Sequence, residues 1–377
     1  MLGSGYVKYS CDLAHKYKSI IGHPKKYSLK SPKPIPEKGC TMQNRCLYLD
    51  KNHNLTIENK EIPKPGPGQV LVKIAANGIC GSDVHFYQDG RLGNFVVTTP
   101  YIPGHESSGT IVALGENATR YQEGQRVVIE PGVPCGNCTD CKLGRYNLCP
   151  DVVFLSAPPI NGTFCDYLCI SEHFVFPIPD SLSFELAALV EPLAVAIHAI
   201  NRTSLRPGDT GVIVGAGPIG LLTLQAFKAA GGGRAICIDL LEKRLEMAKK
   251  LGADEVIIPG KTPVSDIGDI VFETAGSDAA TAGLFQLAKR GGRVVQVGWP
   301  TSNKVTLDVA ALMEKELDYV GVNRYANAFE AAVTWLSDGR INTNGIITQR
   351  YPFDQAPEAF KWALEHPHDT IKVMVLN

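Results

Sequence analysis

The sequence of 377 residues has almost no net charge and no long hydrophobic run. Its 37 Lys and Arg residues nearly balance 38 Asp and Glu residues, which leaves a formal net charge of −1. This balance gives no reason to expect nucleic acid or an acidic membrane as a partner. No stretch approaches the roughly 18 apolar residues of a membrane-spanning helix, because the most apolar one, 187–200, contains Glu191, Pro192 and His198. We therefore expect a soluble globular protein, long enough for two domains.

The cysteines do not have the pattern of a secreted disulfide scaffold. There are eleven, an odd number, and four of them fall within residues 135–149. Disulfide-rich secreted domains are short and dense in cysteine, and this chain is neither. A reducing compartment with thiolates on a metal fits better, so we expect a cytoplasmic protein.

The first 41 residues contain no arginine and no apolar segment typical of a secretory signal. They hold eight lysines against two acidic residues, together with four prolines. Such a composition is typical of a disordered tail, and it argues against a mitochondrial transit peptide. We expect residues 1–41 to be an extension outside the fold, with a true translation start at Met42 as the alternative.

The hydrophobic pattern changes near residue 180. Between about residues 46 and 176, short alternating apolar runs are bounded by glycines, which predicts a β-rich region and a hairpin over 47–63. Beyond it, strand-like and helix-like segments alternate, which predicts an α/β, doubly wound parallel sheet.

The clearest motif in the second region is "VGAGPIG", which contains Gly215, Gly217 and Gly220. It follows a predicted strand, opens a predicted helix, and is followed by Asp239 at the end of the next strand. In this context a G-x-G-x-x-G motif indicates a dinucleotide site, with the pyrophosphate at the helix N-terminus. A carboxylate at Asp239 would bind the ribose hydroxyls and repel a 2′-phosphate, so NAD is favoured over NADP. The alternative is a glycine-rich turn without a ligand. The predicted cofactor residues are Gly215, Gly217, Pro218, Ile219, Gly220, Asp239, Arg244, which could face the adenine, Val297 and Arg324.

The stretch "CGNCTDCKLGRYNLC" has the spacing C-x2-C-x2-C-x7-C, with Cys135, Cys138, Cys141 and Cys149. Four thiolates satisfy a closed tetrahedral zinc site, so we predict a structural zinc. Free thiols, disulfides and an iron–sulfur cluster are the alternatives. A site with four protein ligands leaves no position for substrate, and any catalytic metal must lie elsewhere.

Cys80, His105 and Glu106 are candidates for an open site with mixed ligands. Catalytic zinc has three protein ligands and one open position. Taken singly, Cys80 is better read as a small buried thiol and His105 as a core histidine. The combination of all three with a dinucleotide motif favours a catalytic metal.

Together these motifs resemble the zinc-dependent medium-chain dehydrogenases, over almost the whole chain from about Met42. "GICGSDVH", "PGHESSG", the four-cysteine stretch and "VGAGPIG" stand in that family's order and spacing. "IEPG", "GRYNLC", "APP", "VEPLAV" and "NRYAN" resemble the polyol branch of sorbitol, xylitol and L-arabinitol dehydrogenases. The resemblance implies a GroES-like catalytic domain over 42–194 and 325–377, with a Rossmann NAD-binding domain over 195–324 between its two parts.

The resemblance also implies a role for each matching residue. Cys80, His105 and Glu106 would hold the catalytic zinc, while Glu191 would lie beside it or approach the metal directly; which glutamate is the ligand stays open. Asp83 would orient His105. Protons would leave through Ser82 and His85, or through Glu191 and water. The implied substrate contacts are Phe86, Phe154, Glu191, Arg324 and Tyr325. The family suggests a homotetramer with two zinc ions per chain and a small-molecule polyol as substrate.

Three departures from the polyol pattern stand out. Phe86 replaces a frequent tyrosine and Asn323 a frequent phenylalanine, which leaves the particular polyol open. The segment between Ile258 and Asp269 is short, which predicts a shortened helix in the nucleotide-binding domain. Alternative functions are L-threonine 3-dehydrogenase or another zinc alcohol dehydrogenase, a zinc-independent quinone reductase, and a non-catalytic NAD(H)- or zinc-binding protein.

Overall fold

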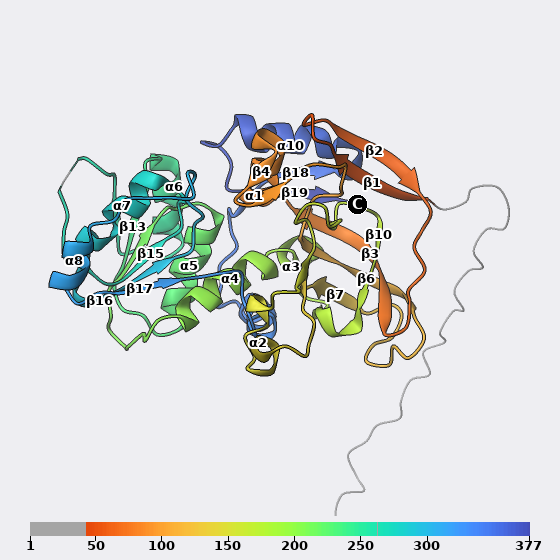
Figure 1. Ribbon diagram of the computed structural model, residues 1–377, viewed down its shortest axis with the longest axis horizontal. Helices are drawn as coiled ribbons and strands as arrows, with labels where there is room; N and C mark the ends of the chain where they lie inside the picture. Colours follow the sequence, from red (N-terminus) through yellow and green to blue (C-terminus); the bar gives the residue numbers. More distant parts are fainter. Residues whose placement is uncertain (1–42, 262) are drawn as a thin grey trace, which may run out of the picture. The chain divides into compact units, whose positions relative to one another are not determined.

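The structure is a computed structural model that describes residues 43–261 and 263–377. The extension predicted for residues 1–41 lies outside the described residues. The described chain forms two large sheets and three small two-stranded ones (Figure 1).

The first large sheet has seven strands and belongs to the β-rich region. Its order is β11-β7-β6-β3-β19-β18, with β10 also paired to β3. The pairs β11–β7, β7–β6, β6–β3, β3–β19 and β3–β10 are antiparallel, whereas β18 and β19 are parallel. The bounds are β3 Gln69–Gly78, β6 Glu106–Leu114, β7 Arg126–Ile129, β10 Tyr167–Ser171, β11 Val175–Pro177, β18 Ile347–Pro352 and β19 Lys372–Leu376.

Short elements surround this sheet. The predicted hairpin is confirmed, with β1 (Asn44–Leu49) antiparallel to β2 (Leu55–Lys60). The two other small sheets are formed by β4 Arg91–Leu92 with β5 Phe95–Val96 and by β8 Gly132–Val133 with β9 Val153–Phe154. The helices here are α1 Gly81–Asp89, α2 Thr139–Lys142 and α10 Ala356–Glu365, with 3-10 turns at Tyr146–Leu148, Glu172–Phe174 and Phe353–Gln355.

The second large sheet has six parallel strands in the order β14-β13-β12-β15-β16-β17. The order reverses between β12 and β15, which makes the crevice at their carboxyl ends the expected nucleotide site. The strands are β12 Gly211–Val214, β13 Ala235–Ile238, β14 Glu255–Ile257, β15 Gly268–Glu273, β16 Ala288–Gln296 and β17 Asp318–Gly321. The helices between them are α5 Pro218–Ala229, α6 Glu242–Lys250, α7 Asp278–Leu287 and α8 Val309–Glu314. The α/β fold with a doubly wound parallel sheet is therefore confirmed.

The most apolar segment forms buried helices of the core. It consists of α3 (Phe184–Ala187) and α4 (Val190–Asn201). By length and composition, the stretch from Phe184 to Asn201 would be apolar enough to cross a membrane, but 67% of it is buried inside the fold. Leu193 and Ile197 of α4 share one core cluster with Leu221 of α5 and Phe329 of α9 (Phe329–Ser337).

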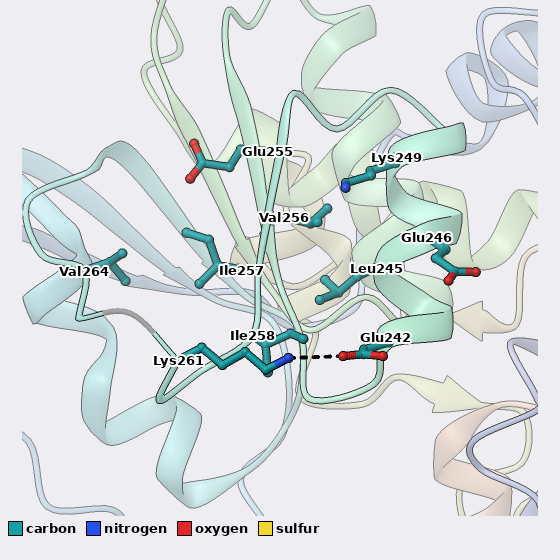
Figure 2. A pocket seen from close by; sticks show the side chains of 10 residues that line it. All are labelled: Glu242, Leu245, Glu246, Lys249, Glu255, Val256, Ile257, Ile258, Lys261 and Val264. Carbon is teal, nitrogen blue, oxygen red and sulfur yellow. Dashed lines mark hydrogen bonds and ion pairs between the residues drawn. The ribbon is translucent and has the colours of Figure 1, made fainter.

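The chain returns to the first sheet after β17. In Figure 1 the blue strands β18 and β19 lie beside the orange β3, and Met374 pairs with Gly78. Residues 258–261 and 263–267, between β14 and β15, form no helix, which goes beyond the shortening that the sequence predicted. Side chains of α6 and β14 line an open groove of about 450 Å³ at this edge of the parallel sheet (Figure 2).

Candidate active site and metal centres

Three potential metal ligands from two separate segments converge in the β-rich region. Cys80 caps the N-terminus of α1, His105 directly precedes β6, and Glu106 is the first residue of β6. One ligand atom from each lies within 4.8 Å of the other two. A thiol, an imidazole and a carboxylate are all donors that zinc accepts. The donor set therefore fits a zinc ion with an open fourth position.

Strand pairing explains why these residues meet. β3 and β6 are antiparallel, and Gly78 at the end of β3 pairs with Glu106 at the start of β6. A Cβ atom on Gly78 would lie 2.2 Å from a carboxylate oxygen of Glu106. Only glycine leaves room for this carboxylate beside Cys80.

Asp83 holds together the two loops that carry the ligands. It is fully buried and accepts backbone hydrogen bonds from Cys80 (3.0 Å) and Gly104 (3.1 Å), and a third from the Ser156 hydroxyl (2.9 Å). Its Oδ1 lies 3.8 Å from Nδ1 of His105, beyond hydrogen-bond distance. Within the described residues, this buried Nδ1 has no hydrogen-bond partner. The Asp83 carboxylate thus fixes the loop before His105, and the predicted direct orientation of the imidazole stays a prediction.

Lys372 is a neighbour of the ligand group that the sequence analysis missed. Its Nζ donates to both Glu106 oxygens, at 2.7 and 2.6 Å, and to the Ile79 carbonyl at 3.1 Å. The side chains of Lys372 and Glu106 are only 2% and 1% exposed. Burial alone would lower the pKa of Lys372, but Glu106, Cys80 and Glu191 together raise it. A lysine that opens a buried apolar strand was a signal that a buried carboxylate must lie near.

Glu191 lies close by but outside the three-ligand group. It lies in the first turn of α4, is 6% exposed, and accepts a 2.9 Å hydrogen bond from the Tyr325 hydroxyl. Burial, opposed by His105 and reinforced by Glu106, raises the pKa of Glu191 to about 7. For His105 itself burial acts to lower the pKa, but Cys80 and Asp83 together raise it well above its ordinary value. The site therefore combines a potential metal group with a carboxyl that titrates near neutral pH.

Three of the predicted substrate residues lie next to these groups. The Phe154 ring centroid is 5.6 Å from that of His105, and the Arg324 guanidinium lies 5.0 Å above the Phe154 ring. Arg324 also donates to the Asn147 carbonyl at 2.9 Å. Phe154, Arg324 and Tyr325 line one small cavity.

Phe86 lies elsewhere. It is 4% exposed and meets the Tyr101 ring edge-on, with Leu49 and Val97 in the same core cluster. This packing does not support the prediction that Phe86 contacts the substrate. The sequence alone did not predict whether Phe86 lies on the face of α1 that packs against the core or on the face toward the site.

The predicted proton relay through Ser82 and His85 lies on α1 beside Cys80. Ser82 is half-buried, while His85 is exposed and pairs with Asp89 on the next turn at 3.1 Å. Neither contact tests the relay, which stays a prediction.

The glycine-rich loop has the geometry of a dinucleotide site. Gly215 has φ +98°, a left-handed conformation that favours glycine, and Gly217 caps the N-terminus of α5. A Cβ atom on Gly220 would lie 1.8 Å from the Gly215 carbonyl oxygen, so helix and strand can approach only with glycine there. Pro218 and Ile219 form the first helical residues.

The other predicted cofactor residues lie around this loop. Asp239 accepts backbone hydrogen bonds from Ala216 at 2.6 Å and from Leu241 at 2.8 Å. Arg244 on α6 donates to the Pro367 carbonyl, and its Nη1 lies 3.8 Å from the Cβ position of Gly217. Val297 follows β16, and its backbone N–H donates a hydrogen bond to the backbone carbonyl of Glu273 at the end of β15. These positions bring Asp239 and Arg244 to the loop, whereas Arg324 lies with the substrate residues.

The four clustered cysteines form a second potential metal site. Their sulfur atoms lie within 4.8 Å of one another, and all nine cysteines of the described residues are unpaired. Backbone N–H groups of Cys138 and Cys141 point at sulfurs of the cluster, at 3.4 and 3.5 Å. Hydrogen bonds from the Asn137 and Cys138 backbone lower the pKa of Cys135 to about 7. Four sulfur ligands so close together fit a closed zinc site, and none of these four cysteines forms a disulfide in the structure.

Comparisons with known proteins agree with this geometry. Residues 66–180 match the family described as "Alcohol dehydrogenase GroES-like domain", and residues 218–338 match "Zinc-binding dehydrogenase". A sorbitol dehydrogenase of Bacillus subtilis is 44% identical over 88% of this chain and 96% of its own length. A D-xylulose reductase of Saccharomyces cerevisiae is 36% identical over 87% and 96%. A solved oxidoreductase of unknown specificity from Escherichia coli is 36% identical, with a TM-score of 0.85 over 89% of this chain and 99% of that one.

The chain belongs to the zinc-dependent medium-chain dehydrogenase family, and within that family to the polyol dehydrogenase branch. The β-rich sheet is its GroES-like part, and the parallel sheet is its Rossmann part.

Proposed function

We propose that this protein oxidises a secondary hydroxyl of a polyol to a ketose and transfers the hydride to NAD. The observation that carries the proposal is the convergence of Cys80, His105 and Glu106 next to a buried Glu191–Tyr325 pair. The sorbitol dehydrogenase and D-xylulose reductase relatives support a polyol of the sorbitol, xylitol or arabinitol type.

We propose two zinc ions per chain. Cys80, His105 and Glu106 would hold the catalytic one, and the four clustered cysteines the structural one. When bound, the catalytic zinc supplies Lewis-acid polarisation of the substrate oxygen, and NAD supplies the hydride acceptor. The residues of the protein position these groups and take up the hydroxyl proton.

The residues around the ligand group divide this work. Asp83 fixes the loop positions of Cys80 and His105, while Lys372 holds the Glu106 carboxylate in place. Glu191 is the proposed first acceptor of the hydroxyl proton, because a carboxyl with a pKa of about 7 can take up and release a proton near neutral pH. Arg324, Tyr325 and Phe154 are the proposed walls of the polyol site.

The cofactor preference rests on Asp239. Its carboxylate lies at the glycine-rich loop, where the adenosine ribose binds in this fold. A negative charge there favours the free hydroxyls of NAD over the 2′-phosphate of NADP.

A substrate panel tests the proposed function. Sorbitol, xylitol, arabinitol and galactitol should each be compared with threonine and with short alcohols, in the presence of NAD. We expect NADH formation with at least one polyol at a kcat/KM well above that for threonine or ethanol. Preference for threonine or for a simple alcohol would support the alternative zinc dehydrogenases instead.

We also propose a cytoplasmic homotetramer. The unpaired thiols of the described residues suit a reducing compartment, and the family resemblance suggests four subunits. Fractionation of cells and sedimentation of the purified protein would test the two parts separately.

A further inference from the structure

Glu130 is a buried carboxyl group for which the proposed reaction has assigned no role so far. It directly follows β7, is 2% exposed, and accepts a 2.7 Å hydrogen bond from the Tyr146 hydroxyl. The Tyr146 oxygen in turn accepts the backbone N–H of Asn327 at 2.8 Å. Both side chains are thus fixed in place, with the Glu130 carboxyl held inside the protein.

Glu130 lines two cavities. The inner one has about 10 Å³ and is lined by Tyr325, Arg324 and Phe154 as well as by Glu130 and Tyr146. This is roughly the space that one water molecule needs, and the polar groups around it can bind a water. A water there would connect the Tyr325 side of the cavity to Glu130.

The outer cavity has a volume of about 410 Å³, and Glu130 and Tyr146 also line it. Its rim includes the exposed side chains of His173, Asn327 and Glu330. Glu130 and Tyr146 therefore line both the small buried cavity next to the substrate residues and a larger one that reaches the surface.

The chemistry of these groups suits proton transfer. Burial raises the pKa of Glu130 to about 7, with Tyr146 opposing and Glu191 adding to the shift. Burial and the nearby Glu191 also raise the pKa of Tyr325 well above its ordinary value, so its hydroxyl keeps a proton to donate. The other charged or titratable groups on the two cavities are Arg324 on the inner one and Cys141, His173 and Glu330 on the outer one.

We infer that Glu130 carries the proton released by polyol oxidation from the active site to the outer cavity. The inference rests on the proposed function. Oxidation of a secondary hydroxyl to a ketone removes a hydride, which the dinucleotide takes, and one proton, which must leave. Glu191 first takes up that proton and passes it to the Tyr325 oxygen. At the same time, the Tyr325 hydroxyl gives its own proton to a water in the inner cavity. The water protonates Glu130, and Glu130 releases the proton to solvent in the outer cavity.

The Glu130→Gln variant tests this role. Glutamine has nearly the same size and still offers an oxygen to Tyr146, but it cannot exchange a proton. We expect kcat for polyol oxidation to fall about a hundredfold, which is the lower end of the usual acid–base contributions, with KM nearly unchanged. The solvent isotope effect on kcat should increase, and small diffusible buffers should restore the rate as their concentration rises. Glu330→Gln removes a charge from the rim of the outer cavity and is the matched control, with kcat expected to stay near wild type.

A spectroscopic measurement tests Glu130 without turnover. Infrared difference spectra of the cofactor-free protein should show a protonated carboxyl band that titrates near pH 7 in the wild type. This band should be weakened in Glu130→Gln and retained in Glu330→Gln.

Three results would overturn the inference. The first is an unchanged kcat in Glu130→Gln. The second is a lower kcat with no response to buffer and no change in the solvent isotope effect, because such a result would mean that Glu130 only holds Tyr146 in place. The third is an infrared titration near pH 7 that is identical in Glu130→Gln. If that variant does not fold, Glu130→Asp serves instead: we expect a reduced, buffer-stimulated kcat, and a rate indifferent to buffer would count against the relay. Wild-type protein that oxidises no polyol refutes the proposed function, whereas an active wild type with an indifferent Glu130→Gln refutes only the relay.

Discussion

Replacing Lys372 by methionine should strongly destabilise the metal-free protein. The Lys372 ammonium bonds both oxygens of Glu106 and the Ile79 carbonyl, and both charged side chains are almost fully buried. Methionine fills similar space but leaves the Glu106 carboxylate buried without its partner. Removal of one member of a buried ion pair costs about 3–5 kcal/mol, so we expect a loss of about that size in the free energy of unfolding.

A double-mutant cycle separates this effect from simple loss of packing. Lys372→Met, Glu106→Gln and the double variant should be compared with wild type by urea denaturation in the presence of a chelator, so that zinc does not compensate. We expect the double variant to recover at least about 1 kcal/mol relative to the sum of the two single losses, because no unpaired charge remains. A loss below about 1 kcal/mol in Lys372→Met, or strict additivity in the cycle, would refute the buried ion pair as described.

Three further predictions concern other parts of the molecule. The pKa of Glu130 is about 7 in the folded protein and has its ordinary value of 4.5 in the unfolded chain. The folded protein therefore keeps this proton between pH 4.5 and 7 while the unfolded chain loses it. Wild-type stability should fall as pH rises through this window, by about 3 kcal/mol from this group. In Glu130→Gln, denaturation curves across the same window should show a weaker pH dependence, and an equally steep one would contradict the burial of a protonated Glu130. Cys149→Ser should lower the zinc content measured by atomic absorption from two ions per chain to one and reduce thermal stability, with NAD binding retained; an unchanged zinc content would exclude the four-cysteine site. Asp239→Ala should raise the KM for NAD and weaken discrimination against NADP in steady-state kinetics, and an unchanged NAD/NADP ratio would count against its ribose role.

Local patterns were enough to predict much of the fold. Period-two alternation located the β1–β2 hairpin, and the alternation of strands and helices after residue 180 predicted the parallel sheet. The glycine-rich loop and the four-cysteine stretch could be predicted because each depends on short spacings within a single segment. Cys80 and His105 are 25 residues apart, and their proximity was inferred from their chemistry together with the family resemblance.

The contacts that the sequence did not reveal depend on pairings far apart in the chain. Lys372 meets Glu106 across 266 residues because β19 pairs with β3 at the point where β3 pairs with β6. No pattern in either segment specifies that register. Phe86 shows a different limit: its position in a family motif suggested substrate contact, but the packing of α1 turns its ring into the core. Short motifs therefore predicted the reactive residues of the site better than they predicted the residues that contact and position them.

We propose that the site of Cys80, His105 and Glu106 oxidises polyols with NAD and a bound metal. The most direct measurement is the initial rate of NADH formation from the preferred polyol by wild type and by His105→Ala, with zinc content and NAD affinity determined on the same samples. We predict that His105→Ala loses turnover and one of two zinc ions per chain, while its NAD affinity stays within about twofold of wild type, because the dinucleotide site is built from other residues. Retained polyol oxidation in His105→Ala, or a zinc content that does not change, would contradict the role of His105 as a ligand of the catalytic zinc.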